Sequence, residues 1–392
     1  MQKRKSVDYF LVIGILLLVV FGLIMINSVS VYDYLLTLKD PSQYTINTFA
    51  LKQAILVGIG LVMFTLVSMV HYKFWRKMSL PMYIFGVFML LLLFHPSFGR
   101  KLNGATGWLS FGAMFPSIQP IEFVKLAIVL YLARWLEPKV EELKSMENGF
   151  IPFCIIVGIV GLLVAAQPDF GGLLVIIPTT VVMFYVAGAR TKHLLIVGMI
   201  GMMILFFAFS AFKHVRDRFS DFLDPTIDPS NKNVGWQIQQ SLIAVGSGGF
   251  MGRGINKSIQ KWGYLPEVQN DTIFAAVAEE TGFRGAIALI LIFLFIGWRG
   301  LLISRYAPDK FAKYTAFGIS FWIIWQAFIN IGVTIKILPL TGITLPFISA
   351  GGSSLLINMV SMSILVNISR YVTIPAHESF SNWRRIGGSH TS

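Results

Sequence analysis

Asp271 is the residue of this sequence best placed for proton chemistry, because it lies where a polar segment meets a long apolar run. A carboxylate at such a boundary is suited to take a proton from a hydroxyl group, as a general base does. An Asp at the start of a helix is also a common cap for free backbone N–H groups, and residue type and position alone favour that structural role. The sequence by itself leaves both roles open.

Charged residues inside apolar runs form a second group of candidates, since a charge within a membrane span is costly unless it is paired or faces a polar cavity. Glu122 and Lys125 are three residues apart on one predicted helix, which allows them to pair. Glu280 and Arg284 have the favourable order for a pair four residues apart, and Glu279 is left without an obvious partner. Glu279 is then expected either to line a cavity or to form a hydrogen bond with another helix.

Basic and aromatic residues near the predicted ends of spans add possible binding groups. The basic residues, which suit a pyrophosphate or lipid headgroups equally well, are Arg100, Lys101, Arg216, Arg218, Arg253, Lys257, Lys261 and Lys336. Trp108 suits either an interfacial anchor or a platform on which a sugar ring stacks.

Residue type and spacing exclude other chemistries. Cys154 is the only cysteine, so no intramolecular disulfide is expected. The six His residues are dispersed without HExxH spacing, and the glycine cluster at 246–254 does not match GxGxxG, which argues against histidine metal sites and dinucleotide sites. The formal net charge is +13, but Lys and Arg occur in short clusters between apolar runs, so no nucleic-acid partner is predicted.

Membrane helices must position these candidates. With 55% hydrophobic and 13% charged residues, the chain is too apolar for a water-soluble protein, and we predict an all-α polytopic membrane protein. Backbone polar groups in lipid must be satisfied within each segment, so apolar runs of about 20 residues are expected to be helices. We predict one domain at 1–375 and a short cytoplasmic tail at 376–392. The ten predicted spans are 9–30, 52–70, 79–95, 119–136, 150–166, 170–188, 192–212, 272–298, 314–335 and 349–369.

Lys and Arg near the span ends predict the orientation, because cytoplasmic loops carry an excess of both. They fall mainly in alternate gaps, beginning with residues 3–5, so both termini are predicted to be cytoplasmic. The long segment at about 213–271, between the seventh and eighth spans, is then extracytoplasmic, with a short interfacial helix at 236–246. Six polar motifs fall on that same face, at 103–108, 119–125, 167–171, 216–225, 265–271 and 338–347.

The motifs, taken in order, resemble those of the SEDS family of shape, elongation, division and sporulation proteins. The matching segments are GATGW, QPIEF, QPDFG, GWQIQQSLIAVGSGG, LPEVQND and LPFISAGGSS. The resemblance runs from about residue 8 to residue 372 and implies a ten-helix polymerase of bacterial cell-wall glycan, of the FtsW or RodA type. The LPE sequence shortly before Asp271 favours the FtsW cell-division type.

The resemblance implies that lipid II is polymerised at the outer face of the bacterial plasma membrane, with Asp271 as the catalytic base of a single inverting displacement. The residues expected to bind substrate are Trp108, Gln119, Glu122, Lys125, Asp169, Arg216, Arg218, Gln237, Glu267, Glu279, Lys336 and Ser353. Negative charge on the leaving diphosphate would be stabilised by basic residues or by a divalent ion, so Mg²⁺ is the expected cofactor and no organic cofactor is predicted. The expected partners are a class B penicillin-binding protein transpeptidase and other divisome or elongasome membrane proteins.

The sequence departs from the family pattern in three places. Gly107 stands where the family usually has Arg, and Lys336 stands where it usually has Gly, so Lys336 is predicted to replace the lost positive charge. The usual His-Thr-Asp-Phe segment around the catalytic position reads Gln269, Asn270, Asp271 and Thr272. The departure retains the carboxylate and changes its neighbours.

Two other functions fit the same resemblance. A lipid II flippase would use the charged residues inside the spans to move the headgroup, and a non-catalytic scaffold would recruit the transpeptidase. Both alternatives tolerate Asp271→Asn, whereas a polymerase does not.

Overall fold

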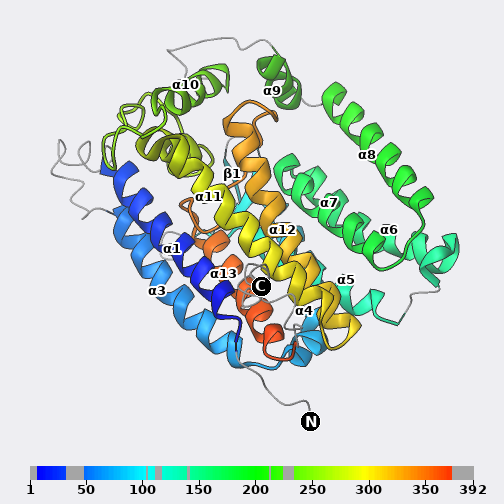
Figure 1. Cartoon of the computed structure of the whole chain (residues 1–392). Coiled ribbons are helices and arrows are strands. Elements are labelled where there is room, and N and C mark those ends of the chain that lie inside the picture. Colours follow the sequence, from blue (N-terminus) through cyan, green and yellow to red (C-terminus); the bar gives the residue numbers. More distant parts are fainter. Residues whose placement is uncertain are drawn as a thin grey trace, which may run out of the picture.

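The computed structural model describes residues 7–31, 48–102, 105–110, 117–138, 142–211, 213–223 and 234–372. Ten helices in this part of the chain coincide with the ten predicted spans (Figure 1). They are α1 (Tyr9–Val29), α3 (Thr48–Met69), α4 (Tyr72–Leu92), α5 (Pro120–Leu136), α6 (Ile151–Ala166), α7 (Phe170–Val186), α8 (Thr191–Ala211), α11 (Ile273–Arg305), α12 (Lys310–Thr334) and α13 (Gly352–Ser369). The predicted tail at 376–392 lies outside the described residues.

Seven helices within the described residues are long and apolar enough to cross a membrane, and the chain is a multi-pass membrane protein. The other three predicted spans correspond to α5, α7 and α8, of which α7 and the first part of α8 are shorter apolar helices. The 17 residues of α5 include Glu122, Lys125 and Arg134, which lowers the hydropathy of this helix. The crossing of the membrane by all ten helices, and the side on which each end lies, remain predictions.

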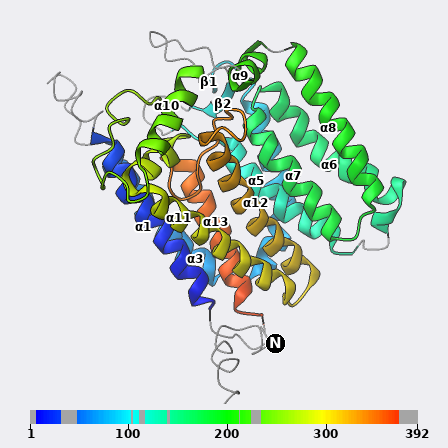
Figure 2. The ribbon, with the colours of Figure 1, turned by 45° about the horizontal axis from the view of Figure 1, so that its top comes forward.

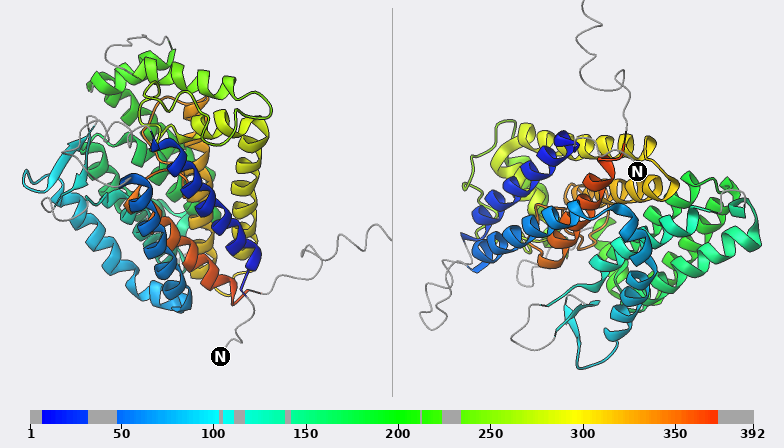
Figure 3. Two further views of the ribbon diagram at one scale, coloured as in Figure 1. Left: turned by 90° about the vertical axis from the view of Figure 1, so that its left-hand side faces the viewer. Right: turned by 90° about the horizontal axis from the view of Figure 1, so that it is seen from below.

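Helix α12 lies at the centre of the bundle, where it packs against α5, α7, α11 and α13. Helices α1 and α3 cover α11 and α13 on one side (Figure 3), whereas α8 stands at the periphery, where it contacts α7 and α9. The backbone N–H of Asp8 donates to Ser369 Oγ at 3.2 Å, so the start of α1 and the end of α13 lie together at one end of the bundle.

Helix α11 differs from the predicted eighth span in length and in shape. It continues to Arg305, so Arg299 lies inside the helix instead of in a connecting gap, and its Nη2 forms a buried ion pair with Asp8 Oδ2 at 2.6 Å. Gly282 interrupts the helix with φ 69° and ψ −171°, a conformation that glycine adopts without steric cost. The predicted pairing of Glu280 with Arg284 is wrong, because Glu280 pairs with Lys261 instead.

The connections contain elements that the hydropathy pattern did not predict. Strands β1 (Gly99–Leu102) and β2 (Ala105–Leu109) form an antiparallel hairpin that places Trp108 opposite Arg100. Short helical turns η2 (Glu142–Lys144) and η3 (Met146–Phe150) precede α6. The long segment before α11 holds α9 (Lys213–Leu223), which was not predicted, and α10 (Val234–Ser247), which confirms the helix expected at 236–246. The hairpin, α9 and α10 lie at the same end of the bundle (Figure 2).

Candidate functional site

A cavity of about 660 Å³ lies at this end of the bundle, between the starts of α5, α7, α11 and α13. Helix α10, the end of β2 and the loop 338–351 complete its wall. Four helices therefore direct their N-terminal ends towards one space, and the partial positive charge of helix N-termini favours anionic ligands there.

Asp271 lies in the wall of the cavity and is 9% exposed to solvent. Helix α11 begins at Ile273 with Thr272 as its N-cap residue, so Asp271 precedes the cap position. Gln237 Nε2 donates to Asp271 Oδ1 at 3.4 Å, and the backbone carbonyl of Asp271 accepts a hydrogen bond from Asn330 Nδ2 at 2.8 Å. The carboxylate is thus held at the boundary between the loop and the cavity.

The residues on either side of Asp271 build the loop that carries it. Asn270 Nδ2 donates to Glu267 Oε2 at 2.6 Å, and Thr272 Oγ1 donates to the carbonyl of Pro266 at 2.9 Å. The carbonyl of Gln269 accepts from the backbone N–H of Ala350 at 2.8 Å. These bonds join the loop to itself and to the segment before α13.

Glu122 and Lys125 form the buried pair that their spacing predicted. Lys125 Nζ lies 2.8 Å from Glu122 Oε2 and 2.8 Å from Gln326 Oε1, and it lies 5.3 Å from the ring centroid of Trp322. Both charged side chains also line the cavity. The pair therefore presents a cation and a carboxylate to any ligand in that space.

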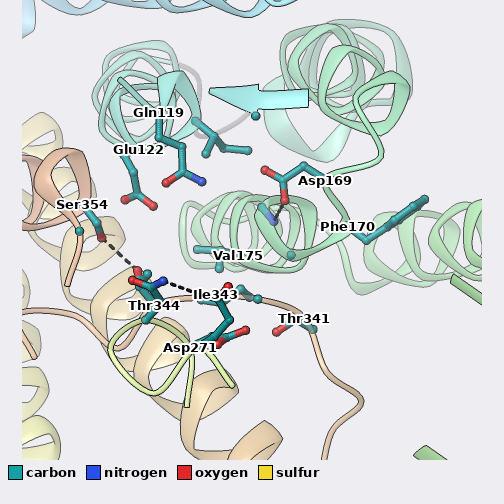
Figure 4. Close-up of a pocket in the computed structure, with 18 of the residues that line it drawn as sticks. Gln119, Glu122, Asp169, Phe170, Val175, Asp271, Thr341, Ile343, Thr344 and Ser354 are labelled. Carbon is teal, nitrogen blue, oxygen red and sulfur yellow. Dashed lines mark hydrogen bonds between the residues drawn. The ribbon is translucent and has the colours of Figure 1, made fainter. Parts of the chain in front are cut away.

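A third carboxylate, Asp169, enters the cavity from the start of α7. Its Oδ1 accepts from the backbone N–H of Gly172 at 2.8 Å, so it is the N-cap of α7 as well as a lining residue. Figure 4 shows Glu122, Asp169 and Asp271 around the same space, each on a different element.

Nine of the residues expected at the site line this cavity. They are Trp108, Gln119, Glu122, Lys125, Asp169, Gln237, Glu267, Asp271 and Ser353. The convergence explains why motifs that are widely separated in the sequence fall on one predicted face of the membrane domain.

Of the other expected residues, Arg216, Glu279 and Lys336 do not line the cavity. Arg216 lies exposed on α9, and the side chain of Arg218 lies outside the described part of the structure. Glu279 is buried and accepts hydrogen bonds from Ser258 Oγ at 2.5 Å and the N–H of Ile259 at 3.0 Å, so it lies in a polar network away from the cavity. Lys336 follows the end of α12 with φ 57° and is not among the residues that line the cavity, so the charge replacement predicted for it stays a prediction.

Sequence reasoning missed several polar residues of the site. Asn270, Thr341, Thr344 and Ser354 line the cavity, and Gln326 lies behind it as a partner of Lys125. The signal for Gln326 was present, since an amide within an apolar run is a candidate for a buried hydrogen-bonding role. Asn270, Thr341 and Thr344 lie inside polar motifs that were predicted to lie on one face, and Ser354 lies inside the family segment LPFISAGGSS. Residue type and spacing did not single out these four from their neighbours in those motifs.

No group of three His, Cys, Asp or Glu side chains that could hold a metal ion occurs among the described residues. The oxygen-rich lining of the cavity suits Mg²⁺ by ligand type, but it does not form a complete protein site.

A family described as cell cycle protein, which includes FtsW, RodA and SpoVE, matches residues 9–374. The chain belongs to this SEDS family. Stage V sporulation protein E of Bacillus subtilis (strain 168) is 41% identical over 372 residues, which cover 94% of this chain and 98% of that protein. The probable peptidoglycan glycosyltransferase FtsW of Legionella pneumophila is 36% identical over 386 residues, covering 97% and 93% of the two chains. The similarity to a sporulation protein and to an FtsW protein confirms the family but does not assign the chain to one branch of it.

Solved structures share the fold. A chain from the structure reported as "Structural coordination of polymerization and crosslinking by a peptidoglycan synthase complex" has a TM-score of 0.73 and 25% identity, covering 93% of this chain and 98% of that one. The rod shape determining protein RodA of Thermus thermophilus has a TM-score of 0.68 and 23% identity, with coverage of 94% and 99%.

Proposed function

We propose that this chain is a peptidoglycan glycosyltransferase that polymerises lipid II at the outer face of the bacterial cytoplasmic membrane. Family membership and relatives with this printed activity support the proposal. The observation that carries it is the gathering of Asp271, Lys125 and seven other expected residues around one cavity. The volume of about 660 Å³ is within the usual range for small-molecule binding sites in proteins.

Asp271 acts as the general base in the proposed reaction. It accepts the proton of an N-acetylglucosamine 4-hydroxyl group, whose oxygen attacks the muramyl anomeric carbon of a second lipid-linked sugar. The new bond between this carbon and the attacking oxygen forms as the bond from the carbon to the diphosphate oxygen breaks, which inverts an α linkage to β. One base suffices, because the diphosphate leaves without being protonated.

Lys125 stabilises the negative charge that develops on the leaving undecaprenyl pyrophosphate. It is the lysine that lines the described cavity, and the nearby helix N-termini add partial positive charge. Arg216 and Lys336, which were expected to share this role, lie outside the cavity lining.

Mg²⁺ enters the proposal only as an ion held largely by the substrate. The cation usually keeps several waters and binds one or two carboxylates together with substrate phosphates, which is compatible with a cavity that lacks a three-residue metal cluster in its described part. Asp169 and Glu267, which line the cavity, would be its protein ligands.

The site is proposed to face the periplasmic or external side, with both chain termini in the cytoplasm. The alternating positions of Lys and Arg support this orientation. A class B penicillin-binding protein transpeptidase is the proposed partner, together with other divisome or elongasome membrane proteins. The similarity to a chain from a peptidoglycan synthase complex supports the partnership.

Polymerisation of purified lipid II by the wild-type chain and by Asp271→Asn tests the proposal, each with and without the transpeptidase. We expect glycan strands from the wild type and none from Asp271→Asn, with lipid II binding retained. Glycan synthesis by Asp271→Asn would refute the role of the base. A wild type that moves lipid II across vesicles without making glycan would favour the flippase, and growth supported fully by Asp271→Asn would favour the scaffold.

A further inference from the structure

Two amide side chains lie on one face of α12, directly behind the cavity wall. Gln326 and Asn330 are four residues apart, about 6 Å along the helix axis, and are 0% and 1% exposed. Neither side chain lines the cavity. Each of them, however, contacts a residue that does.

Asn330 joins the loop of the proposed base to the last loop of the domain. Its Nδ2 donates to the backbone carbonyl of Asp271 at 2.8 Å and to that of Ile343 at 2.7 Å. Since both acceptors are carbonyl oxygens, they fix which end of the amide faces them. Its Oδ1 is buried and has no hydrogen-bond partner among the described residues, so this amide uses its donors and leaves its acceptor unsatisfied.

Gln326 makes the equivalent connection for the proposed cation. Its Oε1 accepts from Lys125 Nζ at 2.8 Å and from Trp322 Nε1 at 2.8 Å, while its Nε2 donates to the carbonyl of Thr344 at 3.0 Å. The amide therefore fixes Lys125 on α5 relative to the same last loop.

The two amides meet consecutive residues of that loop, Ile343 and Thr344. The loop is also joined to the segment before α11, because Ala350 N–H donates to the carbonyl of Gln269 at 2.8 Å. The backbone of residues 343–344 is thus hydrogen-bonded to Asn330, which also holds the Asp271 loop, and to Gln326, which also holds Lys125.

We infer that Asn330 and Gln326 are positioning residues, which set the distance between the Asp271 carboxylate and the Lys125 ammonium group through residues 343–344. The inference rests on the proposed function, because that distance matters only where Asp271 and Lys125 act in the same reaction. Positioning errors of about 1 Å lower enzymatic rates by about 10²-fold, so loss of either bridge is expected to affect the chemical step strongly.

The test compares Asn330→Ala and Gln326→Ala with a matched control, Ser320→Ala. Ser320 is also buried on α12, but its hydroxyl donates only within the helix, to the carbonyl of Ala316 at 2.6 Å. For each purified variant, kcat for lipid II polymerisation, the Kd of fluorescent lipid II and the melting temperature in detergent are measured.

For Asn330→Ala we expect kcat to fall about 10²-fold while the Kd stays within about threefold, because the base does not hold the substrate in the ground state. For Gln326→Ala we expect a fall in kcat and a weaker Kd, because Lys125 contacts the diphosphate before and during the reaction. Ser320→Ala is expected to keep both values near those of the wild type.

A wild-type kcat in Asn330→Ala would overturn the inference. So would a loss of kcat that only accompanies equal losses in lipid II binding and melting temperature, since that pattern marks a folding defect. Where the Ala variant does not fold, Asn330→Leu retains most of the volume without donors and must show the same selective loss of kcat. Failure of the proposed function itself is distinguishable, because the wild-type chain would then make no glycan.

Discussion

Two buried glutamate–lysine pairs lie in different parts of this molecule. Glu122 and Lys125 approach to 2.8 Å beside the cavity, with side chains 6% and 5% exposed. Glu280 and Lys261 approach to 3.2 Å between α11 and the loop before it, where both side chains are 0% exposed. The residue types and burial are similar, and the surroundings differ.

Glu280 and Lys261 form the enclosed pair, and both side chains are hydrogen-bonded to other groups of the protein. Glu280 accepts from Ser28 Oγ at 2.6 Å and from the backbone N–H of Asn256 at 2.9 Å, and Lys261 Nζ donates to Asn256 Oδ1 at 2.6 Å. The cavity pair has open space beside it, so a ligand anion can share Lys125 without unfolding any element. Access to a ligand, rather than burial or charge, separates the pair proposed to bind substrate from the structural pair.

Breaking the enclosed pair should have the largest effect on stability. Lys261→Met leaves Glu280 buried without its cation, and removal of one member of a buried pair typically costs about 3–5 kcal/mol. A large decrease in the free energy of unfolding in detergent is expected, measured by denaturant titration. The double variant Lys261→Met with Glu280→Gln should recover part of the loss, and equal stability of single and double variants would contradict the assignment.

Breaking the cavity pair should affect activity instead. Lys125→Met removes the proposed charge stabilisation of the leaving diphosphate, which is worth about 10²–10³-fold in kcat by analogy with other preorganised groups. Lipid II polymerisation measures this loss. The free energy of unfolding should decrease less than in Lys261→Met, because water in the cavity can solvate Glu122. If Lys125→Met were strongly destabilised but normally active per folded molecule, the cavity pair would be structural and this prediction would be wrong.

The turn at Gly282 should have an intermediate effect, because it allows the loop 249–254 to lie against α11 beside the enclosed pair. The N–H of Arg253 donates to the carbonyl of Glu279 at 3.0 Å, and that of Gly254 donates to the carbonyl of Glu280 at 2.9 Å. Gly282→Ala places a side chain at φ 69° and against the backbone of Gly252, with an expected cost of about 1–3 kcal/mol in unfolding free energy. An unchanged free energy of unfolding in Gly282→Ala would contradict this prediction, because it would show that the backbone at this turn adjusts to a side chain without cost.

The smallest effect is expected for the partly exposed ion pair between Arg253 and Glu279, next to the enclosed pair. Arg253 Nε lies 3.4 Å from Glu279 Oε1, and the Arg side chain is 38% exposed. Solvent screens such a pair, so Arg253→Ala should lower the free energy of unfolding by at most about 1 kcal/mol. A loss as large as that of Lys261→Met would mean that Arg253 belongs to the structural core of the loop.

The sequence predicted the ten long apolar helices and the gathering of the polar motifs at one end of the bundle. Hydropathy is a local property, and a span in lipid must satisfy its own backbone hydrogen bonds, so each run could be assigned without knowing its neighbours. The pairing of Glu122 with Lys125 was predictable for the same reason, since three residues on a helix fix their proximity. The resemblance to the SEDS family then selected Asp271 from several possible carboxylates.

Only the tertiary structure decided which carboxylates meet the cavity and which are sealed inside the fold. Glu280 bonds with Ser28, a residue 252 positions away, and no local pattern contains that contact. Gly282 breaks the helix on which the expected pairing with Arg284 depended, and Asn330 joins two loops through backbone carbonyls, which residue type does not reveal. Local hydropathy sets the elements, but the access of a charged group to a ligand depends on how distant elements close around it.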